Sequence, residues 1–186
     1  MLQLRSITTR DEAWYAYAEA LLHASFPPEE RRNDDEQRLN ADTVSHFHTD
    51  IILADDHPIG LITYWTFPSF CYIEHFATSP QERNKGYGRE ILQLFCRSMA
   101  LPIVLEVELP DDDVSRHRTA FYQRNGFQLC DSFPYLQPPY REGDSFLPMH
   151  LMVHGMLSEA TTLQCVRETI YREVYGRGMS GHPSIH

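Results

Sequence analysis

The residues with the clearest chemical potential lie in a short loop, residues 83–88, of sequence RNKGYG. An apolar run typical of a strand, residues 70–78, precedes the loop, and a run with helical periodicity, residues 87–99, follows it. The first amides of a helix have no acceptor within the helix, and the helix dipole adds positive potential at that end. Two glycines leave the backbone open to a ligand, while Arg83 and Lys85 add full positive charges. The pattern therefore predicts an anion site that can hold a pyrophosphate.

The glycine spacing of this loop excludes two common nucleotide motifs. The dinucleotide fingerprint G-x-G-x-x-G requires a third glycine where this chain has Ile91, and the P-loop pattern G-x-x-x-x-G-K-[ST] is absent from the sequence. The loop instead reads R-x-x-G-x-G and follows residues 77–80, of sequence ATSP. This run resembles motif A of the GNAT (Gcn5-related N-acetyltransferase) superfamily, which binds the pyrophosphate of acetyl-coenzyme A.

A second run, residues 116–127, resembles motif B of the same superfamily through its ending F-Y-x-x-x-G-F. The two motifs follow in the family's order and spacing, with one expected strand between them, and the resemblance covers residues 1–155. Two residues depart from the family pattern. His117 stands where relatives often have asparagine, and Asn84 stands where the loop usually has glycine, which costs little if the φ of Asn84 is negative.

The resemblance implies an α/β fold with a mixed, mostly antiparallel central sheet of about seven strands, helices on both faces, and a splay between the fourth and fifth strands. It implies acetyl-coenzyme A as cosubstrate and acetyl transfer to a primary amine by direct attack. It also implies that backbone amides near Ala77 polarise the thioester carbonyl. The residues that it assigns to coenzyme binding are Phe76, Ala77, Thr78, Arg83, Asn84, Lys85, Gly86, Tyr87, Gly88, Arg89 and His117.

Acetyl transfer requires a neutral amine and a stabilised leaving thiolate, so a base and an acid are expected at the site. In many relatives, a glutamate at the position of Glu74 takes the proton from the amine, usually through a water molecule, and a tyrosine at the position of Tyr122 lies beside the coenzyme sulfur. The resemblance gives the same roles to these two residues. Each has a structural alternative, because Glu74 can pair with a neighbouring arginine and Tyr122 can pack as a core aromatic. A regular strand places Tyr72, Glu74, Phe76 and Thr78 on one face.

Two further carboxylates, Glu106 and Glu108, alternate with Val107 on the strand expected over residues 102–109. Together with Glu74 they can line an acidic pocket that binds a protonated amine, and the alternative is a polar strand end. Two segments cover the acceptor in many relatives, and their equivalents here are residues 26–32 and the loop around Pro139-Tyr140.

The elements that must position these residues alternate between strands and helices, as in an α/β domain. Further strands are expected over residues 4–7, 51–54, 59–66, 127–135 and 147–154, and further helices over residues 9–23, 29–39 and 114–125. The run Thr9 to Glu12 has the pattern of a capping box at the start of the first helix. The expected organisation is an acetyltransferase domain over 1–155, an amphipathic helix over 156–176 capped by Ser158, and a flexible tail over 177–186.

The apolar stripe of the last helix, Leu163, Val166, Ile170 and Val174, favours packing on its own domain, with a homodimer contact as the alternative. The formal net charge of −10 argues against general nucleic-acid binding and against an anionic membrane surface. Neither a membrane-spanning apolar run nor a signal-peptide pattern is present, and the four cysteines lack disulfide or metal spacing, so a cytoplasmic protein without a metal is expected. The expected partner is a small-molecule or peptide amine. The rival function is a non-catalytic acyl-coenzyme A sensor or structural module of the same fold.

Overall fold

The computed structural model describes residues 1–177, so nearly all of the tail expected over 177–186 lies outside the described residues. Within this range the chain forms an α/β fold with an eight-stranded, mostly antiparallel sheet in the order β1-β2-β3-β4-β5-β8-β6, with β7 paired to β8. β4 and β5 are the parallel pair, at the position where the splay was expected. The strands are β1 (Leu2–Ile7), β2 (Phe47–Ala54), β3 (His57–Thr66), β4 (Cys71–Thr78), β5 (Ile103–Glu108), β6 (Phe127–Leu129), β7 (Tyr135–Gln137) and β8 (Leu147–His154).

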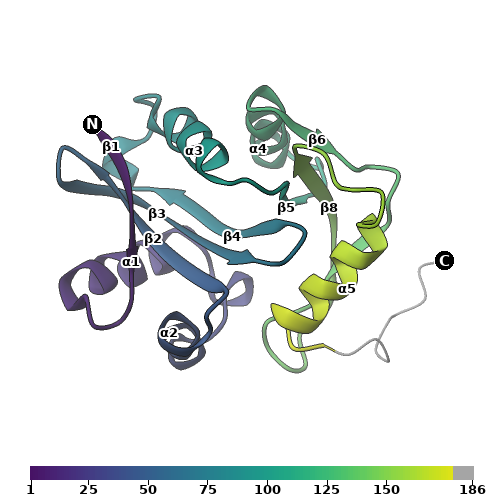
Figure 1. Ribbon diagram of the computed structural model, residues 1–186, viewed down its shortest axis with the longest axis horizontal. Helices are drawn as coiled ribbons and strands as arrows, with labels where there is room; N and C mark the ends of the chain where they lie inside the picture. Colours follow the sequence, from purple (N-terminus) through teal and green to yellow (C-terminus); the bar gives the residue numbers. More distant parts are fainter. Residues whose placement is uncertain (178–186) are drawn as a thin grey trace. The chain divides into compact units, whose positions relative to one another are not determined.

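The chain divides into two compact units, and the first comprises residues 1–67 and 73–100. It contains β1 to β3, most of β4, and the helices α1 (Glu12–Ser25), α2 (Asp34–Thr43) and α3 (Tyr87–Ser98). Successive residues of β2 point to opposite faces, because Ile51 packs against Tyr15 of α1 while Ile52 packs against Ile91 of α3. Helices α1 and α3 therefore cover opposite faces of this part of the sheet (Figure 1).

The second unit comprises residues 68–72 and 101–177, with the helices α4 (Asp113–Arg124) and α5 (Leu163–Glu173). Strand β8 is central in it, since β8 pairs with β5 on one side and with β6 and β7 on the other. The first residues of β4 belong to this unit, where the Cys71 amide donates to the Pro102 carbonyl at 2.8 Å. Val166 and Ile170 of α5 are fully buried, so the predicted apolar stripe packs within the chain.

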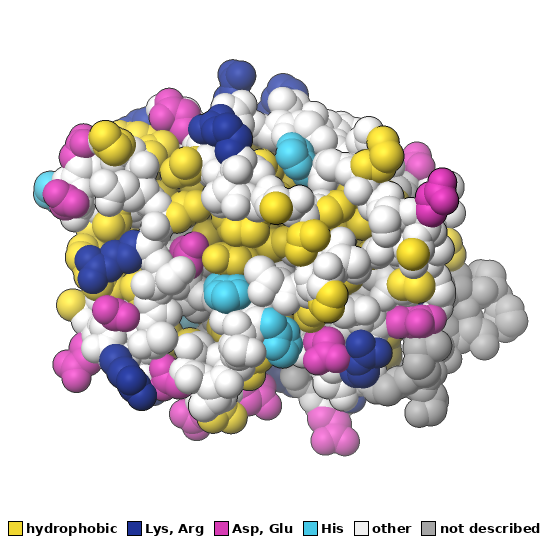
Figure 2. All heavy atoms as spheres, viewed as in Figure 1, with side chains coloured by type: hydrophobic (Ala, Val, Ile, Leu, Met, Phe, Trp, Pro, Cys, Tyr) yellow, Lys and Arg dark blue, Asp and Glu magenta, His cyan; other side chains and the backbone are white. Residues whose placement is uncertain are grey.

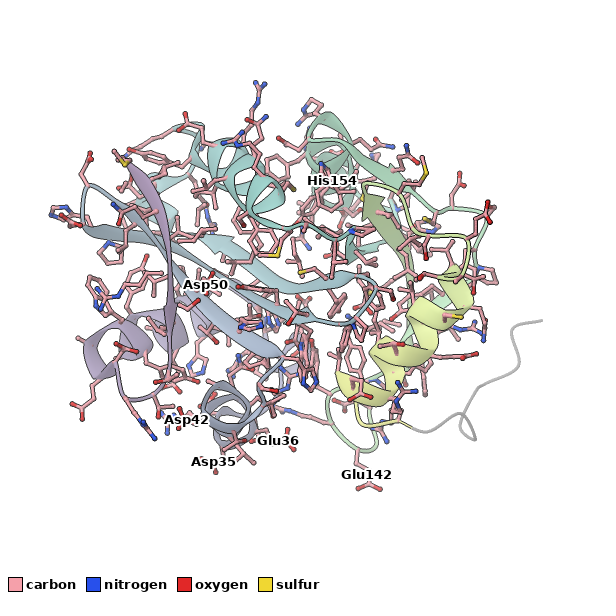
Figure 3. The ribbon with its side chains drawn as sticks, viewed as in Figure 1. Asp35, Glu36, Asp42, Asp50, Glu142 and His154 are labelled. Carbon is pink, nitrogen blue, oxygen red and sulfur yellow. The ribbon has the colours of Figure 1, made fainter. Side chains whose placement is uncertain are left out.

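Several predicted boundaries are wrong, each because a polar side chain bonds elsewhere. Helix α1 begins at Glu12, since the amide and hydroxyl of Thr9 bond instead to Asp42 of α2. Asp42 is labelled in Figure 3, beside α2. Helix α5 begins at Leu163, where the Thr162 side chain accepts the Cys165 amide at 3.2 Å. Ser158 begins only a turn, in which the Thr161 amide donates a hydrogen bond to the Ser158 carbonyl at 2.9 Å.

Two predicted elements are divided in the structure. The helix expected over residues 29–39 is a short 3₁₀ turn, Pro28–Glu30, followed by α2, whose start is capped by Asn33. The strand expected over residues 127–135 is the pair β6 and β7, separated by a turn in which the Phe133 amide bonds to the Cys130 carbonyl.

None of the helices within residues 1–177 has the length and hydropathy that a membrane span requires.

Candidate active site

The loop between β4 and α3 presents a run of free backbone amides. Gly86 is the N-cap of α3 and has a φ of +87°, a conformation that suits glycine. The helix uses the Gly86 carbonyl as its first acceptor, at 3.2 Å from the Arg89 amide. Among the described residues, nothing accepts a hydrogen bond from the amides of residues 84–88. These donors lie at the positive end of the α3 dipole, an arrangement that is suited to binding an anion.

The predicted cationic side chains of this loop differ in exposure and in pairing. Arg83 and Arg89 are exposed, whereas Lys85 pairs with Glu82 at 3.0 Å while more than half of its side chain remains exposed. An exposed pair is weak, so Lys85 can exchange Glu82 for a phosphate. Figure 2 shows acidic and basic side chains interspersed on the visible face, with Lys and Arg side chains at the top, where α3 lies in Figure 1.

The conformation of Asn84 differs from the one expected. Its φ is +64°, in the left-handed region, rather than negative. Asparagine reaches this region more readily than other residues with a Cβ, because its short polar side chain can bond locally. Asn84 therefore adopts a left-handed conformation at the loop position where the resemblance implies glycine.

Strand β4 is irregular at Glu74 and His75. The Trp65 indole donates to Glu74 at 2.9 Å, and Thr63 bonds to His75 at 3.0 Å. Trp65 and Thr63 are two residues apart on β3 and so lie on one face, which places Glu74 and His75 on that face as well. Phe76 packs on the opposite face, with Ile52, Ile59 and Ile91. The predicted common face of Tyr72, Glu74, Phe76 and Thr78 is therefore wrong, because an extra residue interrupts the alternation, as in a β-bulge.

The end of β4 lies unusually close to β3. A Cβ on Gly60 would stand 2.6 Å from the Ala77 carbonyl oxygen and 3.4 Å from the Thr78 Cα. The absence of a side chain at Gly60 thus allows this approach. Ala77 and Thr78 belong to the backbone segment 76–78, which the resemblance assigns to the thioester and the pantetheine arm.

The Glu74 carboxylate is buried in an ion pair with Arg32. Arg32 donates Nη1 to Oε2 at 2.8 Å and Nη2 to Oε1 at 2.6 Å, and only 4% of its side chain is exposed, against 0% for Glu74. Burial by itself raises the pKa of Glu74. The charge of Arg32 and the hydrogen bonds from Arg32 and the Trp65 indole lower the pKa by more than burial raises it, so the pKa lies below its usual value. The structure contains the arginine pairing that the sequence left open. Glu74 as a whole is half-buried, so its exposed surface is main chain.

The same face of β4 anchors residues 26–32, the segment expected to cover the acceptor. The buried His75 donates Nε2–H to the Glu30 carbonyl at 3.0 Å, and the Phe26 ring lies edge-on to it at 4.7 Å. The Arg32 guanidinium lies over Phe47 and the neighbouring indole, at 5.6 and 5.5 Å from the ring centres. Burial lowers the pKa of His75, which keeps the ring neutral near pH 7. Arg32 and His75 therefore fix this segment on the strand.

Tyr122 lies on α4 of the second unit and is half-buried against the rings of Phe121 and Phe127, at 5.3 and 5.5 Å. Its hydroxyl makes no hydrogen bond to any residue within 1–177. Burial raises its pKa to about 12, with Arg118 opposing the shift and Glu108 adding to it. The phenol is thus protonated and able to donate near pH 7. His117 is exposed on the same helix.

Glu106 and Glu108 contact separate groups of the second unit. Glu108 forms an ion pair with Arg118 of α4 and lines a groove of about 300 Å³ with Asp111, Asp112 and other residues. Glu106 accepts hydrogen bonds from Tyr135, Gln137 and Tyr175. The two carboxylates therefore have no hydrogen-bond or ion-pair partner in common among the described residues.

Arg32, Trp65, Tyr135 and Tyr175 were not singled out by the sequence as site residues. The carboxylate partners of Arg32, Tyr135 and Tyr175 lie 42, 29 and 69 residues away in the chain, and the partner of Trp65 lies on the next strand, so the spacing within one element could not reveal them. Among residues 1–177, no group of three or more histidine, cysteine, aspartate or glutamate side chains could hold a metal ion.

Comparison with known proteins gives a consistent result. The sequence model of the "Acetyltransferase (GNAT) family" matches residues 11–127. A structure from Bacteroides thetaiotaomicron, named "Putative acetyltransferase from GNAT family", is 48% identical, with a TM-score of 0.91 over 94% of this chain and 99% of that one. A Bacillus subtilis protein, "Putative acetyltransferase YjbC", is 27% identical over 112 residues, which are 59% of this chain and 56% of that protein. This chain thus spans little more than half of that relative.

A more distant structure shows the same fold. An acetyltransferase from Bacillus subtilis, solved in complex with CoA, is 15% identical to this chain, with a TM-score of 0.54. The match covers 84% of this chain and 100% of that one.

Proposed function

Because the chain belongs to the acetyltransferase (GNAT) family, we propose that it transfers the acetyl group of acetyl-coenzyme A to a primary amine. The observation that carries this proposal is the run of amides over residues 84–88, at the start of α3, that donate to no acceptor in the described part of the chain. These amides bind the pyrophosphate, with Arg83, Lys85 and Arg89 as cationic side chains around it. A structural relative that was solved with CoA supports the choice of ligand.

The backbone near the end of β4 receives the thioester in this proposal. The irregularity at Glu74 and the exposed main chain there leave peptide groups available beside the strand. Amides of residues 76–78 hold the pantetheine arm and polarise the thioester carbonyl, as donors that are already oriented. Such donors stabilise the oxyanion without reorganising during the reaction.

The chemical step is a direct attack of the neutral amine nitrogen on the carbonyl carbon. A C–N bond forms, the C–S bond breaks, and the sulfur leaves with the electron pair. The Tyr122 hydroxyl donates a proton to this thiolate, and the nitrogen loses one proton, which returns Tyr122 to its neutral form, so that the products are the amide and the free thiol of coenzyme A. The high pKa of Tyr122, about 12, suits a donor rather than a base.

Glu74 is better suited to hold Arg32 than to accept a proton directly. Its pKa is lowered and both carboxylate oxygens bond to Arg32, so protonating it would break a buried ion pair. We therefore assign Glu74 the positioning of residues 26–32 over the acceptor. A role as base, through a water molecule, stays a prediction that a pH profile of Glu74→Gln tests.

The proposal is tested by measuring thiol release from acetyl-coenzyme A with a panel of primary amines, for the wild type and for Tyr122→Phe. We expect turnover with at least one amine and a lower kcat in the variant, while coenzyme A binding measured by calorimetry is unchanged. Tight coenzyme A binding without turnover on any amine would favour the sensor, and absence of coenzyme A binding would contradict the proposal. The proposal includes a cytoplasmic location, because all four cysteines are free thiols and thiols stay reduced in that compartment.

A further inference from the structure

The first compact unit contains a cavity that the acetyl transfer described above does not use. It is lined by residues of α1, α2, β2 and β3, among them the polar residues Tyr15, Gln37, Thr49 and Thr63. Thr49 and Thr63 are directly opposite each other on β2 and β3, so their side chains share one face of the sheet. The lining residues all belong to the first unit, so the cavity is complete within it.

The hydroxyl of Thr49 is buried without a partner. Only 4% of Thr49 is exposed, and no residue within 1–177 bonds to its Oγ1. Two other polar groups of the wall also lack a partner in that range, the Tyr15 hydroxyl and the side-chain nitrogen of Gln37. Buried polar groups in proteins nearly always have a hydrogen-bond partner, and an ordered water molecule is a common one. The wall of this cavity therefore offers three polar groups to a ligand.

The size and charge of the cavity suit one water molecule. The cavity leaves about 10 Å³ for the centre of a water-sized molecule, which is about the room that one buried water needs. The two carboxylates of the wall are both paired. Glu19 accepts hydrogen bonds from Arg38 at 2.9 and 2.7 Å, and Asp34 accepts one from Arg31 at 3.1 Å. A neutral molecule that both donates and accepts hydrogen bonds therefore fits this wall better than a metal cation does.

From these observations we infer that the cavity binds one water molecule, which bonds to the Thr49 hydroxyl and to the Gln37 amide. A buried water typically makes about three hydrogen bonds, and the Tyr15 hydroxyl supplies the third polar group. The inference concerns the first unit alone and does not rest on the proposed acetyl transfer.

The water site adjoins both bonds that hold residues 26–32 on β4. Gln37 Oε1 accepts a hydrogen bond from Arg32 at 3.1 Å. The hydroxyl of Thr63, on the same wall, bonds to His75 at 3.0 Å. Since an amide nitrogen and its carbonyl oxygen are fixed in one plane, a bond from the water to the Gln37 nitrogen keeps Oε1 turned toward Arg32.

The direct test is the crystal structure of the full chain, for the wild type, Thr49→Val and Thr49→Ser. In the wild type and in Thr49→Ser, we expect the density of one water within about 3.2 Å of both the hydroxyl at position 49 and the Gln37 amide. Thr49→Val keeps the shape but removes the hydroxyl, so the density should be lost and the Gln37 amide should turn away from Arg32. No density in the wild type, or the same water in Thr49→Val, would overturn the inference. Lost density with Gln37 unmoved would support the water site and contradict its effect on Arg32.

Thermal unfolding gives a second measurement, in solution. If the Thr49 hydroxyl bonds to a water, Thr49→Val leaves that water short of a partner and should lower Tm by about 2–4 °C. If the hydroxyl has no partner, the same change removes a buried unpaired group, and an equal or higher Tm would contradict the inference. Thr43→Val, at an exposed threonine of α2, is the control and should change Tm by less than about 1 °C. Should Thr49→Val not fold, the wild-type density decides alone.

Discussion

Replacing Glu74 by glutamine removes the negative charge of a buried pair and leaves the Arg32 guanidinium, 4% exposed, without its carboxylate. Removing one partner of a buried pair costs about 3–5 kcal/mol, since the remaining charge stays desolvated. For a domain of this size, a loss of that order lowers Tm by about 6–20 °C. The expected result is a clear loss of stability whatever the effect on chemistry, measured by calorimetry or circular dichroism.

The matched control removes both charges. Glu74→Gln combined with Arg32→Met should recover much of the stability, because no buried charge is left unpaired. If Glu74→Gln kept the wild-type Tm but lost activity, the pair would not be the main role of Glu74, and the base role would be favoured. If the double variant were less stable than Glu74→Gln alone, the reasoning about the unpaired guanidinium would fail.

The pH dependence of this pair has a definite sign. The pKa of Glu74 is lowered on folding, so the pair stabilises the protein fully above the unfolded pKa, about 4.3. This contribution is lost as pH falls through the lower folded value. Acid titration of the wild type should therefore show a loss of stability below about pH 4.3 that Glu74→Gln lacks.

Three further predictions concern the coenzyme site. Gly60→Ala should destabilise the protein by about 1–3 kcal/mol and weaken coenzyme A binding, because the added Cβ meets the Ala77 carbonyl at 2.6 Å; an unchanged Tm would contradict the close approach. Asn84→Gly should leave stability and coenzyme affinity nearly unchanged, whereas Asn84→Val should lose about 1–2 kcal/mol at its φ of +64°, as denaturant unfolding would show. Tyr122→Phe should lower kcat about 100-fold. Because the pKa of Tyr122 is about 12, the wild-type rate should show no fall from its ionisation up to pH 10, and a fall near pH 8 would exclude Tyr122 as the titrating acid.

Features that depend on contiguous residues could be predicted from the sequence. The loop over residues 83–88, the strand before it and the helix after it follow from local glycine spacing and apolar periodicity. The positions of β5 and α4 were predicted within one residue at each end for the same reason. Boundaries failed where a short polar side chain had a distant partner, as Thr9 has in Asp42.

The bonding partners of Glu74 and Glu106 could not be predicted from contiguous residues. The sequence placed Glu74 on a strand but could not identify its partner, since Arg32 lies 42 residues earlier in the chain. Likewise the donors to Glu106 come from Tyr135 and Tyr175, 29 and 69 residues away. The sequence alone therefore predicted a phosphate-binding loop and revealed the acetyltransferase resemblance. Only the tertiary structure decided that Glu74 pairs with Arg32, whereas Glu106 has only neutral hydrogen-bond partners within residues 1–177, because the pKa of a carboxylate depends on which groups folding brings beside it.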